Sequence, residues 1–126
     1  KRIQEIDFGE LEGVICFNDA HEYLNPEMEK FFTDPWKFKR PKHGENIADI
    51  LARTKDFWDE KIHDPSLLNK TILIASHGCA VRALLQNVYQ DPENFWHGCV
   101  PPNCSVNVVE VKNGQAVLLE EDKVYA

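Results

Sequence analysis

The sequence lacks the features of several large classes of protein. No hydrophobic run approaches the length of a membrane-spanning helix, so we expect no membrane among the partners. Basic residues are also few, because 14 lysines and arginines stand against 21 aspartates and glutamates and give a net charge of −7. This balance argues against a nucleic-acid surface. A second copy of the chain, in a homo-oligomer, stays open as a partner.

The sequence also lacks the cysteine spacing of a disulfide scaffold. The four cysteines are Cys16, Cys79, Cys99 and Cys104, and none belongs to a C-x-x-C pair. With 43% hydrophobic residues the chain can fill a core without cross-links. Reduced thiols are therefore favoured, which predicts a cytoplasmic protein. A metal or thiol site from His97, Cys99 and Cys104 is the alternative, although H-x-C-x4-C matches no common zinc pattern.

The most informative segment of the chain is residues 75–80, Ala-Ser-His-Gly-Cys-Ala. Residues 71–74 before it are β-branched or apolar, which predicts a buried strand. Apolar residues at 81, 84, 85 and 88 follow with the spacing of a helix face. We therefore expect His77 where a central strand meets a helix, the place where open α/β sheets bind ligands. The N–H groups and dipole of that helix end suit a phosphate.

The other segments predict further helices and strands around this unit. Residues 1–13 begin with a strand-like alternation and break at Gly9 and Gly13. Asn113-Gly114 is a strong hairpin signal. The order of elements indicates one α/β domain with a mixed sheet. The expected elements are a short helix starting at 25–27 and ending at 34–35, a long helix over 46–62, a short helix capped by 91–94, and strands over 105–111 and 115–120.

Three segments together resemble the histidine phosphatase superfamily, also called phosphoglycerate-mutase-like. Residues 5–13, Glu-Ile-Asp-Phe-Gly-Glu-Leu-Glu-Gly, are similar to its acid-bearing segment E-x-x-F/Y-G-x-x-E-G. Residues 44–46, Gly-Glu-Asn, open a helix that carries Arg53, as in the family's G-E-S…R stretch. Residues 72–78 resemble the strand that ends in the second catalytic histidine. Residues 102–106 stand where the family has a short turn facing the substrate.

The same resemblance implies parts that this sequence lacks. The family's nucleophilic histidine lies in an R-H-G motif on the first strand, and a second arginine lies on the next strand. None of the H-G pairs at 43–44, 77–78 and 97–98 follows an arginine, and the chain begins at Lys1 without a methionine. We therefore expect residues 1–126 to be the C-terminal part of a single domain. Its fold would be a three-layer αβα sandwich with a mostly parallel mixed sheet, incomplete at the N-terminus.

The resemblance implies a phosphatase of small phosphorylated metabolites that works through a phosphohistidine and needs no cofactor. His77 would donate to the transferring phosphoryl group, and Glu5 would protonate the leaving alkoxide and then deprotonate water. The alternatives are a histidine that caps the helix at 77 and a solvated carboxylate at 5. Because the nucleophile is expected upstream, this chain alone is expected to be inactive.

Three further residues are candidates for substrate binding. Asn103 would contribute its amide and Cys104 its backbone N–H, although an asparagine that closes a loop is the alternative. Arg53 would reach a carboxylate or phosphate of the substrate, although an arginine on the helix surface is the default. For Arg82 the alternatives are the pocket and solvent, and we expect solvent. A cationic lid over the substrate is a further alternative to a solvated loop, formed by Lys37, Lys39, Arg40 and Lys42.

Two other functions stay open within the same fold. Without an R-H-G motif the chain also fits a non-catalytic phosphate-binding or regulatory member. A phosphoglycerate-type mutase is the second alternative, although the segment between residues 14 and 43 is short for a glycolytic mutase. The sequence therefore favours a phosphatase and leaves its phosphorylated substrate open.

Overall fold

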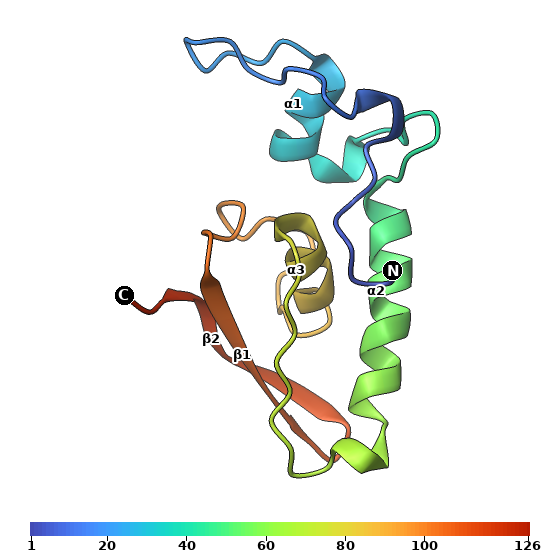
Figure 1. Cartoon of the computed structure of the whole chain (residues 1–126), viewed down its shortest axis with the longest axis vertical. Helices are drawn as coiled ribbons and strands as arrows, with labels where there is room; N and C mark the ends of the chain where they lie inside the picture. Colours follow the sequence, from blue (N-terminus) through green and yellow to red (C-terminus); the bar gives the residue numbers. More distant parts are fainter. The chain divides into compact units, whose positions relative to one another are not determined.

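The computed structural model describes all 126 residues, and their contacts separate into two compact units. We call residues 6–50 the small unit and residues 1–5 with 51–126 the large unit, and each is described by itself. The helices are α1 (Pro26–Thr33), α2 (Ile47–Ile62) and α3 (Gly78–Leu85), and the strands are β1 (Ser105–Lys112) and β2 (Gln115–Val124) (Figure 1). Three 3-10 turns lie at Gly9–Leu11, Pro35–Lys37 and Pro65–Leu67.

In the small unit, α1 begins where the sequence predicts. The Asn25 side chain accepts hydrogen bonds from the N–H groups of Glu27 and Met28, at 2.9 and 3.2 Å, and Pro26 occupies the first turn. The helix ends at Thr33, before the Asp34-Pro35 pair. The buried aromatic rings of Phe31 and Phe38 pack edge to face with their centroids 5.3 Å apart. An aromatic cluster therefore supplies much of the core of this unit.

The start of α2 is fixed by a reciprocal pair of caps. The Asn46 side chain accepts from the Asp49 N–H at 3.1 Å, and the Asp49 carboxylate accepts from the Asn46 N–H at 2.9 Å. This is the capping-box arrangement with an aspartate in the third helical position. The helix predicted over residues 46–62 is confirmed, since α2 runs from Ile47 to Ile62.

The large unit contains α3 and the β1–β2 hairpin. Asn113 and Gly114 connect the strands with φ angles of 53° and 73°, the left-handed pair that a tight hairpin turn needs. The predicted hairpin is confirmed, and β2 continues to Val124, beyond the predicted end. Helix α3 is almost entirely buried from Cys79 onward, and Phe95 and Trp96 add large buried side chains to the core of the unit.

Other predicted elements are wrong for this chain. Residues 71–77 run as an extended segment without a pairing partner, and Leu73 is 92% exposed, so the buried strand is absent (Figure 1). Residues 1–8 form no strand, and turns replace the short helix after 91–94. The only sheet is two-stranded and antiparallel, which confirms an α/β chain but forms no parallel sheet. None of the helices combines the length and apolar character needed to cross a membrane.

Candidate active site

His77 lies at the N-terminus of α3. The preceding Ser76 hydroxyl donates a 2.7 Å hydrogen bond to the Ile3 carbonyl, which ties the end of the extended segment to the beginning of the chain. His77 keeps an extended backbone, with φ −121° and ψ 165°, and α3 starts at Gly78. Its side chain makes no capping hydrogen bond and the residue is exposed. The imidazole therefore does not cap α3 in this structure.

Glu5 caps the same helix. Its two carboxylate oxygens accept hydrogen bonds from the backbone N–H groups of Cys79 and Ala80, both at 3.0 Å. A carboxylate at this place complements the positive end of the helix dipole. The expectation that these N–H groups are available to a phosphate is therefore wrong in this structure, because Glu5 occupies two of them. The alternative of a fully solvated Glu5 is also wrong.

Arg53 fixes the backbone that carries Glu5. Its guanidinium donates to three main-chain carbonyls, those of Arg2 at 3.0 Å, Gln4 at 2.8 Å and Glu5 at 3.0 Å. Residues 2–5 do not pair with a strand, so Arg53 satisfies carbonyl groups that strand pairing would otherwise satisfy. Arg53 is absent from the lining of the pocket described next, and its substrate-binding role stays a prediction.

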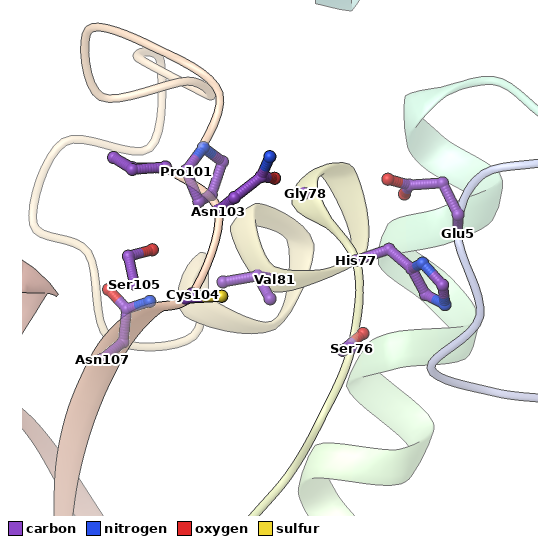
Figure 2. A pocket seen from close by; sticks show the side chains of 11 residues that line it. Glu5, Ser76, His77, Gly78, Val81, Pro101, Asn103, Cys104, Ser105 and Asn107 are labelled. Atoms are coloured by element: carbon purple, nitrogen blue, oxygen red, sulfur yellow. The ribbon is translucent and has the colours of Figure 1, made fainter. Parts of the chain in front are cut away.

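Glu5 and His77 line one open pocket with a volume of about 360 Å³, formed entirely within the large unit. In Figure 2 the Glu5 carboxylate points toward the turn at Gly78, and the opposite wall carries Pro101 and Asn103. The structure thus brings together four of the five predicted site residues. The complete lining is Glu5, Ser76, His77, Gly78, Val81, Pro101, Pro102, Asn103, Cys104, Ser105 and Asn107.

The wall opposite Glu5 is a tight turn that leads into β1. The Ser105 N–H donates to the Pro102 carbonyl at 3.0 Å, and Cys104 has a left-handed backbone with φ 61°. Non-glycine residues adopt this conformation at a cost, and such residues gather at functional sites. Asn103 and Cys104 are both exposed. The turn therefore presents an amide side chain and a thiol to the pocket at a position fixed by the backbone.

The chemistry of the lining is polar and carries one acidic group. The imidazole can donate or accept, the carboxylate can exchange a proton, and the Asn103 amide can do both through separate atoms. No lysine or arginine belongs to the lining. This chain therefore contributes an imidazole, a carboxylate and hydrogen-bond donors to the pocket, but no lysine or arginine side chain.

The environment of Arg82 differs from the one that we expected from the sequence. We expected it in solvent, but it is 0% exposed and forms ion pairs with Glu121 and Asp122. The expectation was wrong because the two carboxylates come from β2, and no local pattern shows that they meet α3.

His97, a member of the alternative metal set, stacks on the Tyr89 ring with centroids 3.5 Å apart. The structure assembles no group of three or more potential metal ligands.

Two cations of the alternative lid have partners within the small unit. Lys37 forms an ion pair with Asp34 at 2.8 Å, and Arg40 pairs with Asp49. The Asp34 carboxylate raises the pKa of the Lys37 ammonium above its usual value, mainly through the hydrogen bond. These ion pairs do not test whether the four cations contact a substrate, so the cationic lid stays an alternative.

The chain belongs to the histidine phosphatase superfamily (branch 1), whose family model matches residues 1–122. A 2,3-bisphosphoglycerate-dependent phosphoglycerate mutase of Rhizobium etli is 31% identical over 86 residues, which cover 68% of this chain and 40% of that protein. The enzyme of the same name from Neisseria meningitidis is 28% identical over 112 residues, covering 69% and 48%. That from Enterococcus faecalis is 40% identical over 45 residues, covering 36% and 20%. The chain thus spans less than half the length of these relatives.

Proposed function

We propose that the protein containing this chain is a phosphatase of small phosphorylated metabolites and acts through a phosphohistidine. The observation that carries the proposal is the common pocket of His77 and Glu5, two residues far apart in the sequence. Membership of the superfamily supports the same chemistry. We further propose that residues 1–126 are the C-terminal part of one domain and that the protein works in the cytoplasm.

In the proposed first step, an imidazole nitrogen supplied by the residues that precede this chain attacks phosphorus. The nitrogen–phosphorus bond forms, the ester phosphorus–oxygen bond breaks, and Glu5 gives its proton to the leaving alkoxide. His77 donates a hydrogen bond to a phosphoryl oxygen as charge spreads over the equatorial oxygens. The arginines that the chemistry requires also come from the preceding residues, since the lining contains no cation.

In the proposed second step, water replaces the enzyme's nitrogen on phosphorus. Glu5, now a carboxylate, takes a proton from the water, the phosphorus–oxygen bond forms, and the phosphorus–nitrogen bond breaks. The Cys79 and Ala80 N–H groups hold this carboxylate at the edge of the pocket. They therefore favour a fixed direction for the proton transfer in both steps.

We also propose a three-layer fold for the protein that contains this chain. The extended segment 71–76 would be an inner strand of a parallel sheet completed by preceding strands, with helices on both faces of the sheet. Its apolar side chains support this proposal, because residues 72–74 are all exposed here, and only neighbouring layers would bury them.

The test is hydrolysis of p-nitrophenyl phosphate by the full-length protein. Glu5→Gln and His77→Ala should each lower kcat/KM by about 100-fold or more, because each removes a group needed in the transition state. Glu10→Gln and His63→Ala are matched controls on exposed residues outside the pocket and should keep nearly full activity. Full activity in both pocket variants, or none in the wild-type protein, would overturn the proposal.

A phosphoglycerate mutase is the second candidate, and it is favoured by the similarity of the chain to phosphoglycerate mutases. In that reaction the phosphohistidine returns its phosphoryl group to a hydroxyl of the substrate instead of to water. Incubation of the full-length protein with 3-phosphoglycerate and catalytic 2,3-bisphosphoglycerate separates the two. Formation of 2-phosphoglycerate faster than inorganic phosphate would identify the mutase, and the reverse would identify the phosphatase.

A further inference from the structure

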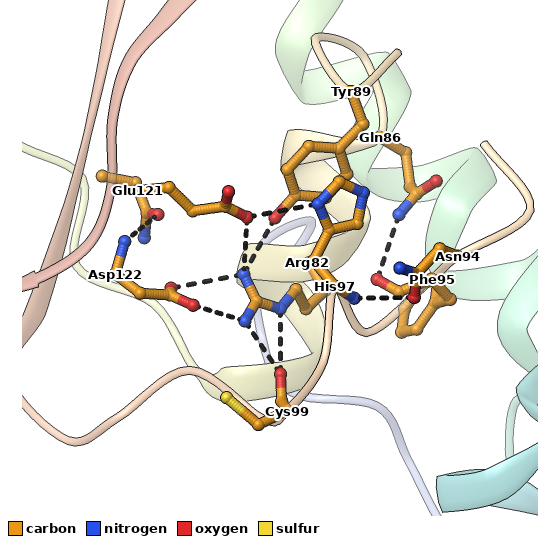
Figure 3. Close-up of polar contacts among 10 residues, drawn as sticks. Arg82, Gln86, Tyr89, Asn94, Phe95, His97, Cys99, Glu121 and Asp122 are labelled. Atoms are coloured by element: carbon orange, nitrogen blue, oxygen red, sulfur yellow. Dashed lines mark hydrogen bonds and ion pairs between the residues drawn. The ribbon is translucent and has the colours of Figure 1, made fainter. Parts of the chain in front are cut away.

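The second notable cluster of the large unit surrounds the buried Arg82 side chain (Figure 3). Its Nη2 donates to the Asp122 carboxylate at 2.5 Å and to the Cys99 carbonyl at 2.8 Å, and its Nε donates to the same carbonyl at 3.2 Å. Its Nη1 donates to the Tyr89 hydroxyl at 2.9 Å and to Glu121 at 3.3 Å. The rigid guanidinium thus joins α3, the segment at Cys99 and β2.

The surroundings of Arg82 keep its guanidinium protonated. Burial lowers the pKa of the Arg82 guanidinium, but the hydrogen bond to Asp122 and the interaction with Tyr89 outweigh burial and leave the pKa above its usual value. Burial also raises the pKa of the Tyr89 hydroxyl, which therefore stays neutral. His97 closes the cluster by stacking on Tyr89, with its Nδ1 3.4 Å from Glu121. The guanidinium is thus a permanent cation between fixed acceptors.

Two of these contacts lead directly to the wall of the pocket. Cys99 immediately precedes residues 100–104, which end at the turn with Asn103 and Cys104. Asp122 also donates its backbone N–H to the Asn107 side chain at 2.9 Å, and Asn107 lines the pocket. The contacts of Arg82 therefore hold the wall at both ends, before residue 100 and at residue 107.

The backbone of this region needs such support. His97, Cys104 and Asp122 have left-handed φ angles of 50°, 61° and 51°. Residues of this kind persist only where surrounding contacts over-determine the conformation. Arg82 supplies such contacts beside His97 and at Asp122, whereas Cys104 has only the local turn. The position of Cys104 consequently depends on the residues that fix the ends of its segment.

We propose that Arg82 is a positioning residue that holds the wall of Asn103 and Cys104 at the distance from His77 and Glu5 that a bound phosphate group requires. The positioning role in catalysis rests on the proposed function, whereas the placement of the wall by Arg82 does not. Arg82 does not line the pocket and reaches its wall through Cys99 and Asp122. Its loss therefore moves the wall and weakens substrate binding, while the reacting groups stay in place.

The first experiment uses the 126-residue chain and needs no activity. Nuclear magnetic resonance spectra of Arg82→Lys and Asp122→Asn should show shifted amide signals through residues 100–107, with the helices retained by circular dichroism. Arg2→Lys is the matched control, because this arginine forms exposed ion pairs with Asp56 and Glu60 and should leave those signals in place. Asp122→Asn keeps the Arg82 guanidinium and the hydrogen bond from the residue 122 N–H to Asn107. This variant therefore still tests the inference if Arg82→Lys fails to fold. Shifts confined to residues 99 and 122 would overturn the inference.

The second experiment uses the full-length protein and p-nitrophenyl phosphate. Arg82→Lys and Asp122→Asn should raise KM about tenfold with kcat nearly unchanged, because a misplaced wall weakens binding in the ground and transition states alike. If the substitutions only destabilise the protein, a smaller fraction is folded, so the apparent kcat falls and KM does not change. That result would overturn the inference. If the wild-type protein shows no turnover, the proposed function fails, whereas the spectra of the first experiment still decide whether Arg82 positions the wall.

Discussion

The backbone N–H of Cys79 donates a 3.0 Å hydrogen bond to a carboxylate oxygen of Glu5, across 74 positions of sequence. Ala80 donates to the other oxygen, so the candidate proton donor is also the cap of α3. The same carboxylate lines the open pocket, where the proposed catalytic acid needs both a fixed direction and access. The capping contact and the proposed catalytic role therefore predict two separate losses when Glu5 is changed.

The contribution of the Glu5 cap to the free energy of unfolding can be measured in the 126-residue chain. Glu5→Gln should lower the free energy of unfolding by about 1 kcal/mol, because an amide presents one acceptor to two N–H groups and no charge to the helix dipole. Urea unfolding followed by circular dichroism measures this difference. Glu10→Gln changes an exposed carboxylate in the same segment and should leave the free energy of unfolding within about 0.5 kcal/mol. Equal effects of the two changes would contradict the capping role.

The bonds of Arg53 to the carbonyls of residues 2–5 predict energetic coupling to Glu5. Arg53→Lys keeps the charge but removes the fork of donors, so the segment loosens and the Glu5 cap weakens. In a double-mutant cycle, Arg53→Lys and Glu5→Gln should therefore be non-additive by about 0.5–1 kcal/mol in the free energy of unfolding. Arg53→Lys paired with Glu10→Gln provides the additive comparison. Additivity in both cycles would show that Arg53 does not position Glu5.

The features that sequence patterns predicted correctly are local ones. Asn25 caps α1 and Asn113-Gly114 closes the hairpin, because the donors and acceptors involved lie within a few residues of each other. The convergence of Glu5 and His77 is different, since only the resemblance of ordered motifs to a known family led to it. Without that resemblance, neither residue type nor spacing would have joined the two positions.

The predictions that failed depend on neighbours outside the local sequence. The apolar pattern of 71–74 predicted a buried strand, but a strand forms and is buried only when neighbours cover its faces and edges. The burial of Arg82 depends on carboxylates 39 and 40 positions away, and an isolated arginine in a helix gives no sign of them. Its position in an almost wholly apolar helix, Gly78–Leu85, is the one local signal that could have suggested burial.

The extended segment gives a prediction about hydrogen exchange. In the 126-residue chain, the amides of residues 72–75 should exchange with little protection, because they have no ladder partners. In the full-length protein, the proposed parallel sheet should slow the same amides by about 100-fold or more. The amide of Val109, which lies in the paired strand β1, serves as the comparison in both samples. Equal exchange of residues 72–75 in the two samples would contradict the proposed sheet.

The capping pair at the start of α2 predicts a dependence of stability on pH. Burial raises the pKa of the Asp49 carboxyl, but hydrogen bonds from the Asn46 N–H and the Arg40 guanidinium outweigh it and hold the pKa below its usual value. A lowered pKa in the folded state stabilises the chain above the unfolded value of about 3.9 and ceases to do so as the pH falls through the folded pKa. Asp49→Asn should therefore cost about 0.5–1 kcal/mol at pH 7 and progressively less below about pH 4.

Urea unfolding of Asp49→Asn and the wild-type chain at a series of pH values measures this difference. Asp59→Asn is the comparison, since Asp59 lies in the last turns of the same helix, where a negative charge opposes the dipole. We expect no loss of stability for that variant at pH 7. A cost of Asp49→Asn that is constant from pH 7 to pH 3 would contradict the assignment of the effect to the ionised carboxylate.

The close approach of Val100 to Gly78 predicts a compensating pair of substitutions. A Cβ at position 78 would lie 2.9 Å from a Val100 methyl carbon and 3.8 Å from a Glu5 carboxylate oxygen. Gly78→Ala should therefore cost about 1–2 kcal/mol in the free energy of unfolding, because the stiff valine cannot withdraw without moving its segment. Val100→Ala removes the methyl carbon, so the same Gly78→Ala change should cost less than about 0.5 kcal/mol in that background. Urea unfolding of the two single variants and the double variant measures the cycle, and an equal cost in both backgrounds would show that Val100 does not limit the space at this edge of the pocket.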